Sequence, residues 1–324
     1  MKRVHRWSTG FLDGQDGFFE ASLHMGCRGK RKTLQEAEAL PPSKAGFYDA
    51  VIVNAKSGLD PFAPEAFQTL RRKFTCPVSL FLGAAQPEVM PPDAVVDQMH
   101  YVFKREPFRD LARYTLSHQN RRKILPTHLS CPLAPTWRRW TSRNAAFPCV
   151  PLACETNQTH DVFFIGGSAE NRFTERERAW STIVKSNVDA VGGLFSIDGY
   201  PVPQDLRTEK VPKPEFKRLL MASRINLALD GIGPFTYRHL EVFWAGAFCL
   251  SNASIDVLKL RAPLLEGRDY VSFTDTTDMM DKIHWYLSHD DARNTIARNG
   301  RQAFERLYDV RAHAQEIAHA LGDA

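Results

Sequence analysis

Arg238 and Glu241 are the two side chains of this sequence whose types and spacing most clearly suit chemistry. Residues three apart on a helix lie on one face, so the two groups would act together. The planar guanidinium of an arginine matches two phosphate oxygens, and a carboxylate can accept hydrogen bonds from a pair of sugar hydroxyls. The pair therefore suits a ligand that carries a phosphate next to a sugar.

Glu241 needs a partner, because it stands in an otherwise apolar helical segment, residues 240–246. Burial of an unpaired carboxylate would cost on the order of several kcal/mol. Two partners could compensate: Arg238 in an internal ion pair, or the hydroxyl groups of a ligand, and we favour the ligand. Thr236 and Tyr237 flank the pair as candidate contacts, whereas His239 suits packing equally well.

The segments around this pair follow the order strand, loop, helix, strand. Residues 225–229 form a short apolar run that ends in a loop containing Gly231 and Gly233, and residues 247–250 form a second buried strand. In open parallel sheets, ligands bind beyond the carboxyl ends of the strands, close to the N-termini of helices. The pair at the start of the intervening helix thus stands where a ligand site is expected.

A second loop, formed by Gly166, Gly167 and Ser168, follows the apolar strand 162–165 and precedes a charged helix. Glycines let a backbone approach a phosphate closely, and the N-terminus of a helix favours negative charge. Tight-turn glycines that bind no ligand would explain the same residues. The spacing fits neither the dinucleotide-binding fingerprint nor a P-loop.

Strands and helices alternate from residue 48 onward, apart from a proline-rich stretch at 126–160. The alternation predicts parallel sheets with helices on both faces, and the proline-rich stretch is the natural domain boundary. The sequence therefore predicts an α/β protein with two Rossmann-like, doubly wound domains that face a cleft, residues 1–150 and 151–324. Residues 1–46 look irregular, and the last helix could cross back to the first domain.

Composition and cysteine spacing favour an ordinary globular protein without a metal. Hydrophobic residues make up 43% and charged residues 24% of the 324 residues. No apolar run reaches the roughly 18 residues that would cross a membrane. The basic N-terminus lacks the apolar core of a signal peptide, so we expect a cytoplasmic protein. The six cysteines lack zinc-ligand spacing and no Asp-x-Asp triplet occurs, so we expect no metal site and no cofactor.

The net charge of +5 comes with short basic clusters at residues 28–32, 71–73, 121–123 and 138–139. The sequence has neither a long basic arm nor interleaved aromatic side chains, so we expect no nucleic-acid partner. Solvated surface residues explain the clusters. An alternative is attraction of an anionic ligand or a lipid surface, which would allow peripheral association with a membrane.

Residues 161–308 resemble the donor domain of group-1 glycosyltransferases of the GT-B fold. The segment from Leu240 to Leu250 resembles their Glu-Ala-Met-Ala-Cys-Gly motif, and Asp161 to Ser168 resembles the strand and glycine loop that open this domain. The arginine shortly before the glutamate is most similar to the spore-maturation-type bacterial members. The resemblance implies a GT-B fold and a nucleotide-sugar donor held by the C-terminal domain.

By this resemblance, Glu241 would bind the ribose and Arg238 the diphosphate, while Gly167 and Ser168 would approach the phosphates.

Arg172 and Lys217 are further candidates for stabilising the departing diphosphate. One position departs from the family pattern. Many retaining members carry another glutamate eight positions before the conserved one, where this sequence has Gly233. The stereochemical outcome of the reaction therefore stays open.

These features predict metal-independent transfer of a sugar from a nucleotide sugar to a carbohydrate or glycolipid acceptor, in the cleft between the domains. An inverting reaction would need a base near the acceptor hydroxyl. The candidates in the glycine-rich N-terminal segment are Asp13, Asp16 and His24. Each could instead be an ordinary turn or surface residue. A catalytically inactive GT-B-like scaffold that binds a nucleotide or glycan is the alternative, and a sugar-nucleotide epimerase is a third hypothesis.

Overall fold

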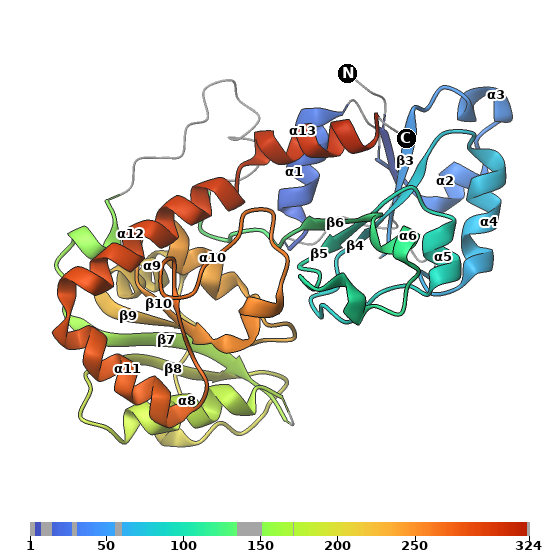
Figure 1. Ribbon diagram of the computed structural model, residues 1–324. Helices are drawn as coiled ribbons and strands as arrows, with labels where there is room; N and C mark the ends of the chain where they lie inside the picture. Colours follow the sequence, from blue (N-terminus) through green and yellow to red (C-terminus); the bar gives the residue numbers. More distant parts are fainter. Residues whose placement is uncertain are drawn as a thin grey trace.

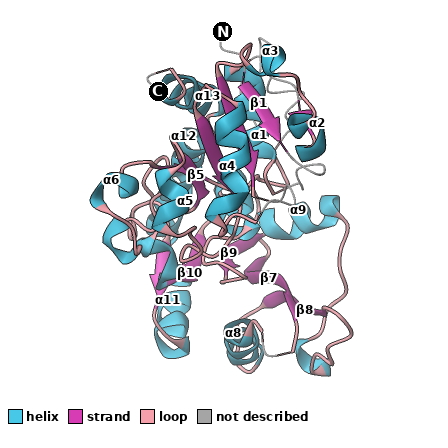
Figure 2. Ribbon diagram, turned by 90° about the vertical axis from the view of Figure 1, so that its right-hand side faces the viewer, coloured by secondary structure: helices cyan, strands magenta, loops and turns pink. Residues whose placement is uncertain are grey.

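The computed structural model describes residues 4–7, 15–27, 31–55, 60–134, 151–170 and 172–322 of the chain. Two parallel β-sheets lie toward opposite ends of an elongated molecule (Figures 1 and 2). Helices cover both faces of each sheet, so each sheet has two apolar packing layers. The predicted α/β, doubly wound architecture is confirmed.

The first sheet has the strand order β2-β1-β3-β4-β5-β6, and all neighbouring strands are parallel. Its strands are β1 (Val4–Trp7), β2 (Arg31–Lys32), β3 (Ala50–Asn54), β4 (Val78–Leu82), β5 (Val102–Arg105) and β6 (Ile124–Thr127). The helices between them are α1 (Gly17–Gly26), α2 (Leu34–Glu38), α3 (Pro42–Ala45), α4 (Pro64–Lys73), α5 (Asp93–Asp97) and α6 (His118–Arg121).

Residues 1–46 contain regular elements, β1, β2 and α1 to α3, and in this respect differ from the predicted irregular segment. The physical reason lies in the sequence of β1, Val-His-Arg-Trp, which lacks the apolar run by which a buried strand is recognised.

The second sheet has the order β11-β10-β9-β7-β8 and is also parallel throughout. Its strands are β7 (His160–Ser168), β8 (Ala190–Ser196), β9 (Ser223–Ala228), β10 (Cys249–Asn252) and β11 (Val271–Phe273). Its helices are α8 (Thr174–Val184), α9 (Lys213–Met221), α10 (Tyr237–Trp244), α11 (Thr276–Ser288) and α12 (Asp290–Leu307). The strand order reverses between β7 and β9, and such a reversal opens a crevice at the carboxyl ends of the two strands.

The side chains of β7 point alternately to the two faces of the sheet, and both faces are covered by helices. Phe163 and Ile165 pack in one apolar cluster with residues of α9, α10 and α12, whereas Val162 and Phe164 pack in another with residues of α8 and α11. Successive side chains of a strand point to opposite faces, so one apolar run supplies both layers. β7 is thereby held between β9 and β8 in the interior of its sheet, with its end at the crevice.

The last helix, α13 (Val310–Ala320), leaves the second unit and lies along α1 of the first (Figure 1). Ile317 and Leu321 are buried with Phe19 and Leu23 against the first sheet. The two helices approach closely at Gly26, where an added Cβ atom would lie 2.5 Å from the carbonyl oxygen of Ala314. The C-terminal helix is therefore part of the core of the N-terminal unit.

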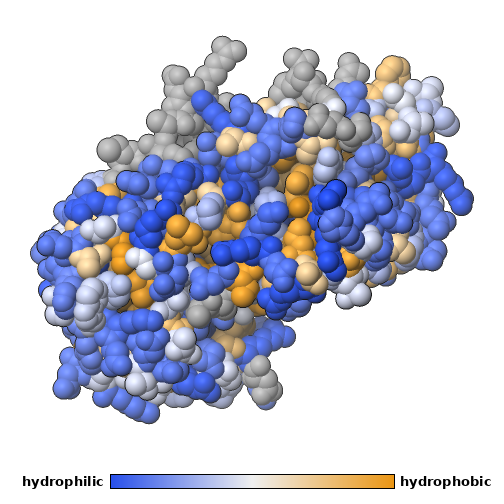
Figure 3. All heavy atoms as spheres, in the orientation of Figure 1, coloured by the Kyte–Doolittle hydropathy of each residue, from blue (hydrophilic) through white to orange (hydrophobic). Residues whose placement is uncertain are grey.

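The two units also meet directly through backbone hydrogen bonds. The Arg109 N–H donates to the Val257 carbonyl and the Lys259 N–H to the Pro107 carbonyl, each at 2.7 Å. Apolar side chains gather in the middle of the face shown in Figure 3, whereas the two ends of the molecule are mostly hydrophilic. Among the described residues, we find no helix that combines the length and the apolar character needed to cross a membrane.

Candidate functional site

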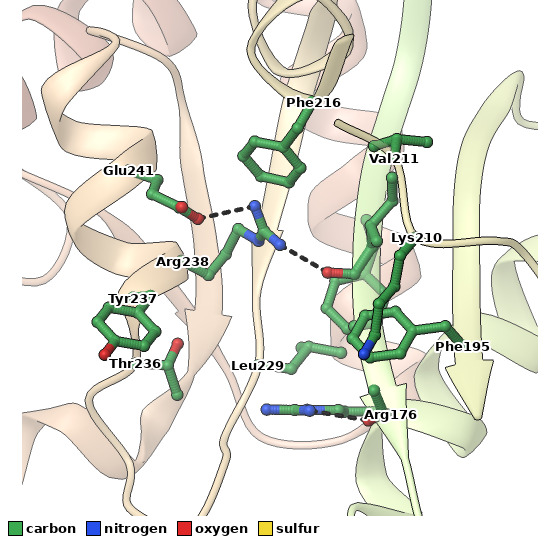
Figure 4. A pocket seen from close by; sticks show the side chains of 14 residues that line it. Arg176, Phe195, Lys210, Val211, Phe216, Leu229, Thr236, Tyr237, Arg238 and Glu241 are labelled. Atoms are coloured by element: carbon green, nitrogen blue, oxygen red, sulfur yellow. Dashed lines mark hydrogen bonds and ion pairs between the residues drawn. The ribbon is translucent and has the colours of Figure 1, made fainter. Parts of the chain in front are cut away.

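A cavity of about 350 Å³ opens at the carboxyl ends of β7, β8 and β9, where the strand order reverses. Its lining comes from the ends of these strands, from the segment that precedes α9 and from the first turns of α8 and α10 (Figure 4). This is the position at which open parallel sheets bind ligands. We therefore take the cavity as the candidate site.

The start of α10 is fixed by His239, which does not line the cavity. The Thr236 N–H donates to Nδ1 of His239 at 3.0 Å, and Nε2 lies 2.8 Å from the hydroxyl of Ser251. The ring is fully buried and stacks on Phe235, and burial lowers its pKa to about 3. His239 is therefore neutral and positions the helix, while Thr236 and Tyr237 face the cavity.

Arg238 and Glu241 both line the cavity and form an ion pair, with Nη1 3.0 Å from Oε2. Nη2 of Arg238 donates to the Ile165 carbonyl at 2.6 Å, and the guanidinium lies over Phe216 at 4.1 Å from the ring centre. The internal ion pair, one of the two alternatives from the sequence, is thus present.

The pair nevertheless leaves hydrogen-bonding groups for a ligand. Within the described residues, no hydrogen bond reaches Oε1 of Glu241, and the buried Nε of Arg238 has no partner. Glu241 is only 8% exposed, and burial raises the pKa of its carboxyl group. An incoming hydroxyl donor would therefore find an acceptor that is already oriented by Arg238.

Two further cations line the cavity, Arg176 and Lys210, and neither was among the residues predicted from the sequence. Arg176 donates from Nε to the Asp230 carbonyl at 2.7 Å and from Nη1 to the Gly167 carbonyl at 2.9 Å. Burial, and then the charge of Arg238, lower its pKa to about 10. Arg176 thus ties the end of β7 to the loop after β9.

Lys210 lies across the cavity from α10, with Nζ 4.8 Å from the centre of the Phe195 ring. In the part of the chain that the structure describes, it makes no hydrogen bond or ion pair. The cavity therefore presents three cationic side chains and one carboxylate, together with the N-terminus of α10. Such a site attracts a polyanion.

Arg176 carried a usable sequence signal, whereas Lys210 carried none. Arg176 stands in the first turn of the helix after the glycine loop, where an anion site is expected, but its Glu-Arg-Glu-Arg context is typical of a solvated face. Lys210 belongs to an irregular segment between β8 and α9.

Three residues predicted for the site do not line it. The Ser168 hydroxyl is buried and donates to Glu177, because β7 continues through Ser168 and alternation turns this side chain away from the cavity. Arg172 is exposed in the turn after β7. Lys217 lies over the ring of Trp244, since its neighbour Phe216 takes the inward position on α9.

Gly166 and Gly167 line the cavity, and at both positions an added Cβ atom would meet the tip of a neighbouring side chain. A Cβ atom at Gly166 would lie 2.5 Å from the Phe164 ring, and one at Gly167 would lie 2.3 Å from Cδ1 of Ile197. Side-chain packing is therefore a reason for glycine at both positions that needs no bound phosphate.

The three predicted base candidates are not gathered in one place. Asp13 lies outside the described residues. Asp16 precedes α1, is 1% exposed and approaches Gly83 at the end of β4. His24 is eight residues further along the helix, about 12 Å away, where its half-exposed ring lies 3.7 Å from Glu20. The structure therefore places Asp16, but not His24, at the carboxyl edge of the first sheet.

The described residues contain no group of three or more His, Cys, Asp or Glu side chains arranged to hold a metal ion.

Residues 172–319 match a protein-family model described as "Glycosyl transferase-like". No curated protein matches the sequence. Anabaena HepE in complex with UDP is similar in structure, with a TM-score of 0.57, 12% identity and coverage of 100% of both chains.

Sucrose-phosphate synthase from Thermosynechococcus elongatus is similar with a TM-score of 0.57, 14% identity and coverage of 98% of both chains. T4 phage BGT in complex with UDP-glucose has a TM-score of 0.52 at 13% identity, with coverage of 98% of this chain and 99% of that chain. These similarities confirm the predicted GT-B fold, and the family match over residues 172–319 is consistent with the predicted resemblance to group-1 glycosyltransferases.

Proposed function

We propose that the protein transfers a sugar from a nucleoside-diphosphate sugar to a carbohydrate or glycolipid acceptor, without a metal ion. The observation that carries the proposal is the cavity at the strand-order reversal, which is lined by Arg176, Lys210 and Arg238 together with the carboxylate of Glu241. The family match over residues 172–319 supports the same reaction class.

Each group of the cavity has a role in this proposal. Glu241 accepts hydrogen bonds from the ribose hydroxyls through Oε1, while Arg238 holds its other oxygen. The diphosphate lies between the first turn of α10 and Lys210, with Arg176 below it. A diphosphate carries about two negative charges near neutral pH, and the lining offers a matching excess of positive charge.

During transfer, the bond between the anomeric carbon and the phosphate oxygen breaks, and its electron pair leaves with the diphosphate. A bond forms from the acceptor oxygen to the anomeric carbon, and the hydroxyl proton passes to a base. Preorganised cations stabilise the departing charge in place of a metal. Asp16, at the carboxyl edge of the opposite sheet, is the base candidate that we retain from the described residues.

Titration calorimetry with UDP, GDP, ADP and dTDP, in the presence of EDTA, tests the donor site. Crystals of Anabaena HepE with UDP and of T4 phage BGT with UDP-glucose make uridine nucleotides the first probes. We expect one nucleotide to bind, and Glu241→Gln to weaken its binding about tenfold, because the ribose hydroxyls would then donate to a neutral amide oxygen instead of a charged carboxylate.

Glu215→Gln is the matched control, since Glu215 forms an exposed ion pair with Arg218, also three residues away, outside the cavity. Transfer is then measured as nucleotide release that depends on added glycan or glycolipid. Binding without acceptor-dependent release would favour the scaffold alternative. A folded protein that binds none of the four nucleotides would contradict the proposal.

A further inference from the structure

Lys104, in the strand β5 of the N-terminal unit, is completely buried. Its ammonium group donates to three carbonyl oxygens: Ala84 at 2.8 Å, Gln86 at 3.1 Å and Arg105 at 2.7 Å. A buried ammonium group is expensive unless all its hydrogens are bonded, and here each of the three has an acceptor. Lys104 thus fastens the loop after β4 to the end of β5.

The fastened loop makes backbone contact with the other unit. An added Cβ atom at Gly233 would lie only 2.0 Å from the carbonyl oxygen of Ala85, so nothing larger than glycine fits there without displacing one of the loops. This contact also gives a physical reason for the absence of the family's first glutamate at this position. Ala85 lies between the two residues that Lys104 holds.

Gly233 belongs to the loop 230–235, which reaches the candidate site within a few residues. The Gly231 N–H donates to the Gly233 carbonyl at 3.0 Å, and the Asp230 carbonyl accepts from Arg176. The same loop leads directly into α10, which carries Arg238 and Glu241. A continuous series of contacts therefore runs from Lys104 through Ala85 and Gly233 to the cavity.

We propose that Lys104 is a positioning residue for the donor site. It holds the Ala85 carbonyl against Gly233, and this contact keeps loop 230–235, Arg176 and the first turn of α10 in the arrangement that binds the diphosphate. The inference rests on the proposed function for the identity of the ligand. It adds that a residue of the N-terminal unit, outside the cavity, sets the affinity for the donor.

A double-mutant cycle tests this inference. Lys104→Met removes the three hydrogen bonds, and Gly233→Ala forces the two loops apart. We expect each to weaken binding of the nucleoside diphosphate about tenfold at pH 6.5. The double variant should bind no more weakly than about the weaker single variant, because both changes break one contact.

Two controls separate positioning from general stability. Lys123→Met removes a lysine that also donates to two carbonyl oxygens of the N-terminal unit, those of Val96 and Asp97. Gly46→Ala adds a methyl group where, apart from the adjacent residues of the chain, no atom lies within 4 Å. We expect both controls to bind the nucleotide as the wild type does, even where Lys123→Met lowers Tm.

Hydrogen exchange gives a readout that needs no ligand. Amides of residues 230–236 should exchange faster in Lys104→Met and Gly233→Ala than in the controls. Unchanged exchange and unchanged affinity in Gly233→Ala would overturn the inference even if Lys104→Met failed to fold, and so would additive effects in the double variant. A wild type that binds nucleotide but transfers no sugar would contradict the proposed reaction and leave this inference standing.

Discussion

Arg176 and Lys210 line the same cavity but are bound in opposite ways. Arg176 is engaged with two backbone carbonyls, whereas Lys210 contacts the face of Phe195 and keeps its ammonium hydrogens for a ligand. A cation that is hydrogen-bonded to the backbone stabilises the fold and also adds positive charge to the cavity. A cation without such bonds adds only the charge.

This difference predicts distinct outcomes for two substitutions. Arg176→Met should lower the free energy of unfolding by about 1–3 kcal/mol, because two partly buried backbone carbonyls lose their donor. Lys210→Met should leave stability within about 0.5 kcal/mol of the wild type and weaken nucleotide binding about tenfold. Urea unfolding and titration calorimetry measure the two effects, with the exposed Lys185→Met as control. Equal losses of stability in both variants would contradict the distinction.

At the residue scale, spacing predicted only part of the site. Arg238 and Glu241 could be identified because a three-residue interval on a helix implies one face, and the structure brings them to 3.0 Å. Lys210 could not be identified, because the path of an irregular segment is set by long-range packing. Ser168 points away from the cavity because β7 ends at this residue, three residues later than the predicted strand 162–165.

At the element scale, apolar runs predicted the strands well where burial is complete. β3 and β4 are buried at every position, and their sequences, Ala-Val-Ile-Val-Asn and Val-Ser-Leu-Phe-Leu, are mostly apolar. The end of β5 breaks this pattern, since Lys104 and Arg105 are buried charges that a sequence reader assigns to the surface. Their hydrogen bonds to distant loops are what make the burial tolerable, and those loops are not visible in local sequence.

The buried lysine in β5 predicts a pH dependence of stability. Burial lowers the pKa of Lys104 from 10.5 to about 7, with Glu106 and Glu88 opposing the shift and Arg105 adding to it. Between pH 7 and 10.5 the unfolded chain holds this proton more tightly than the folded one, so stability should rise with pH in this window. The slope is at most about 1.4 kcal/mol per pH unit. Urea unfolding between pH 7 and 9.5 should show that the free energy of unfolding rises less steeply with pH in Lys104→Met than in the wild type. Identical slopes would refute the lowered pKa of Lys104.

At the scale of the whole molecule, the chain is not two successive, independent units. Helix α13 starts from the C-terminal unit and completes the packing of the first sheet with α1. The sequence could suggest that a last helix crosses back, but it could not say which face it covers. That depends on the apolar residues of α1 and on a close approach at Gly26, about 290 positions away.

Ile317 should therefore stabilise the N-terminal unit although it lies near the end of the chain. Its side chain is 1% exposed and packs in the cluster that contains Phe19 and Ile52. Ile317→Ala should destabilise by about 2–4 kcal/mol, and hydrogen exchange should show the loss of protection first in β3 and β4. Ile183→Ala, at a fully buried position of α8, is the matched change in the other unit and should release β7 and β9 instead. If Ile317→Ala loosened β7 as much as β3, the two units would unfold as one, and the helix would act as a link between them rather than as part of the first core.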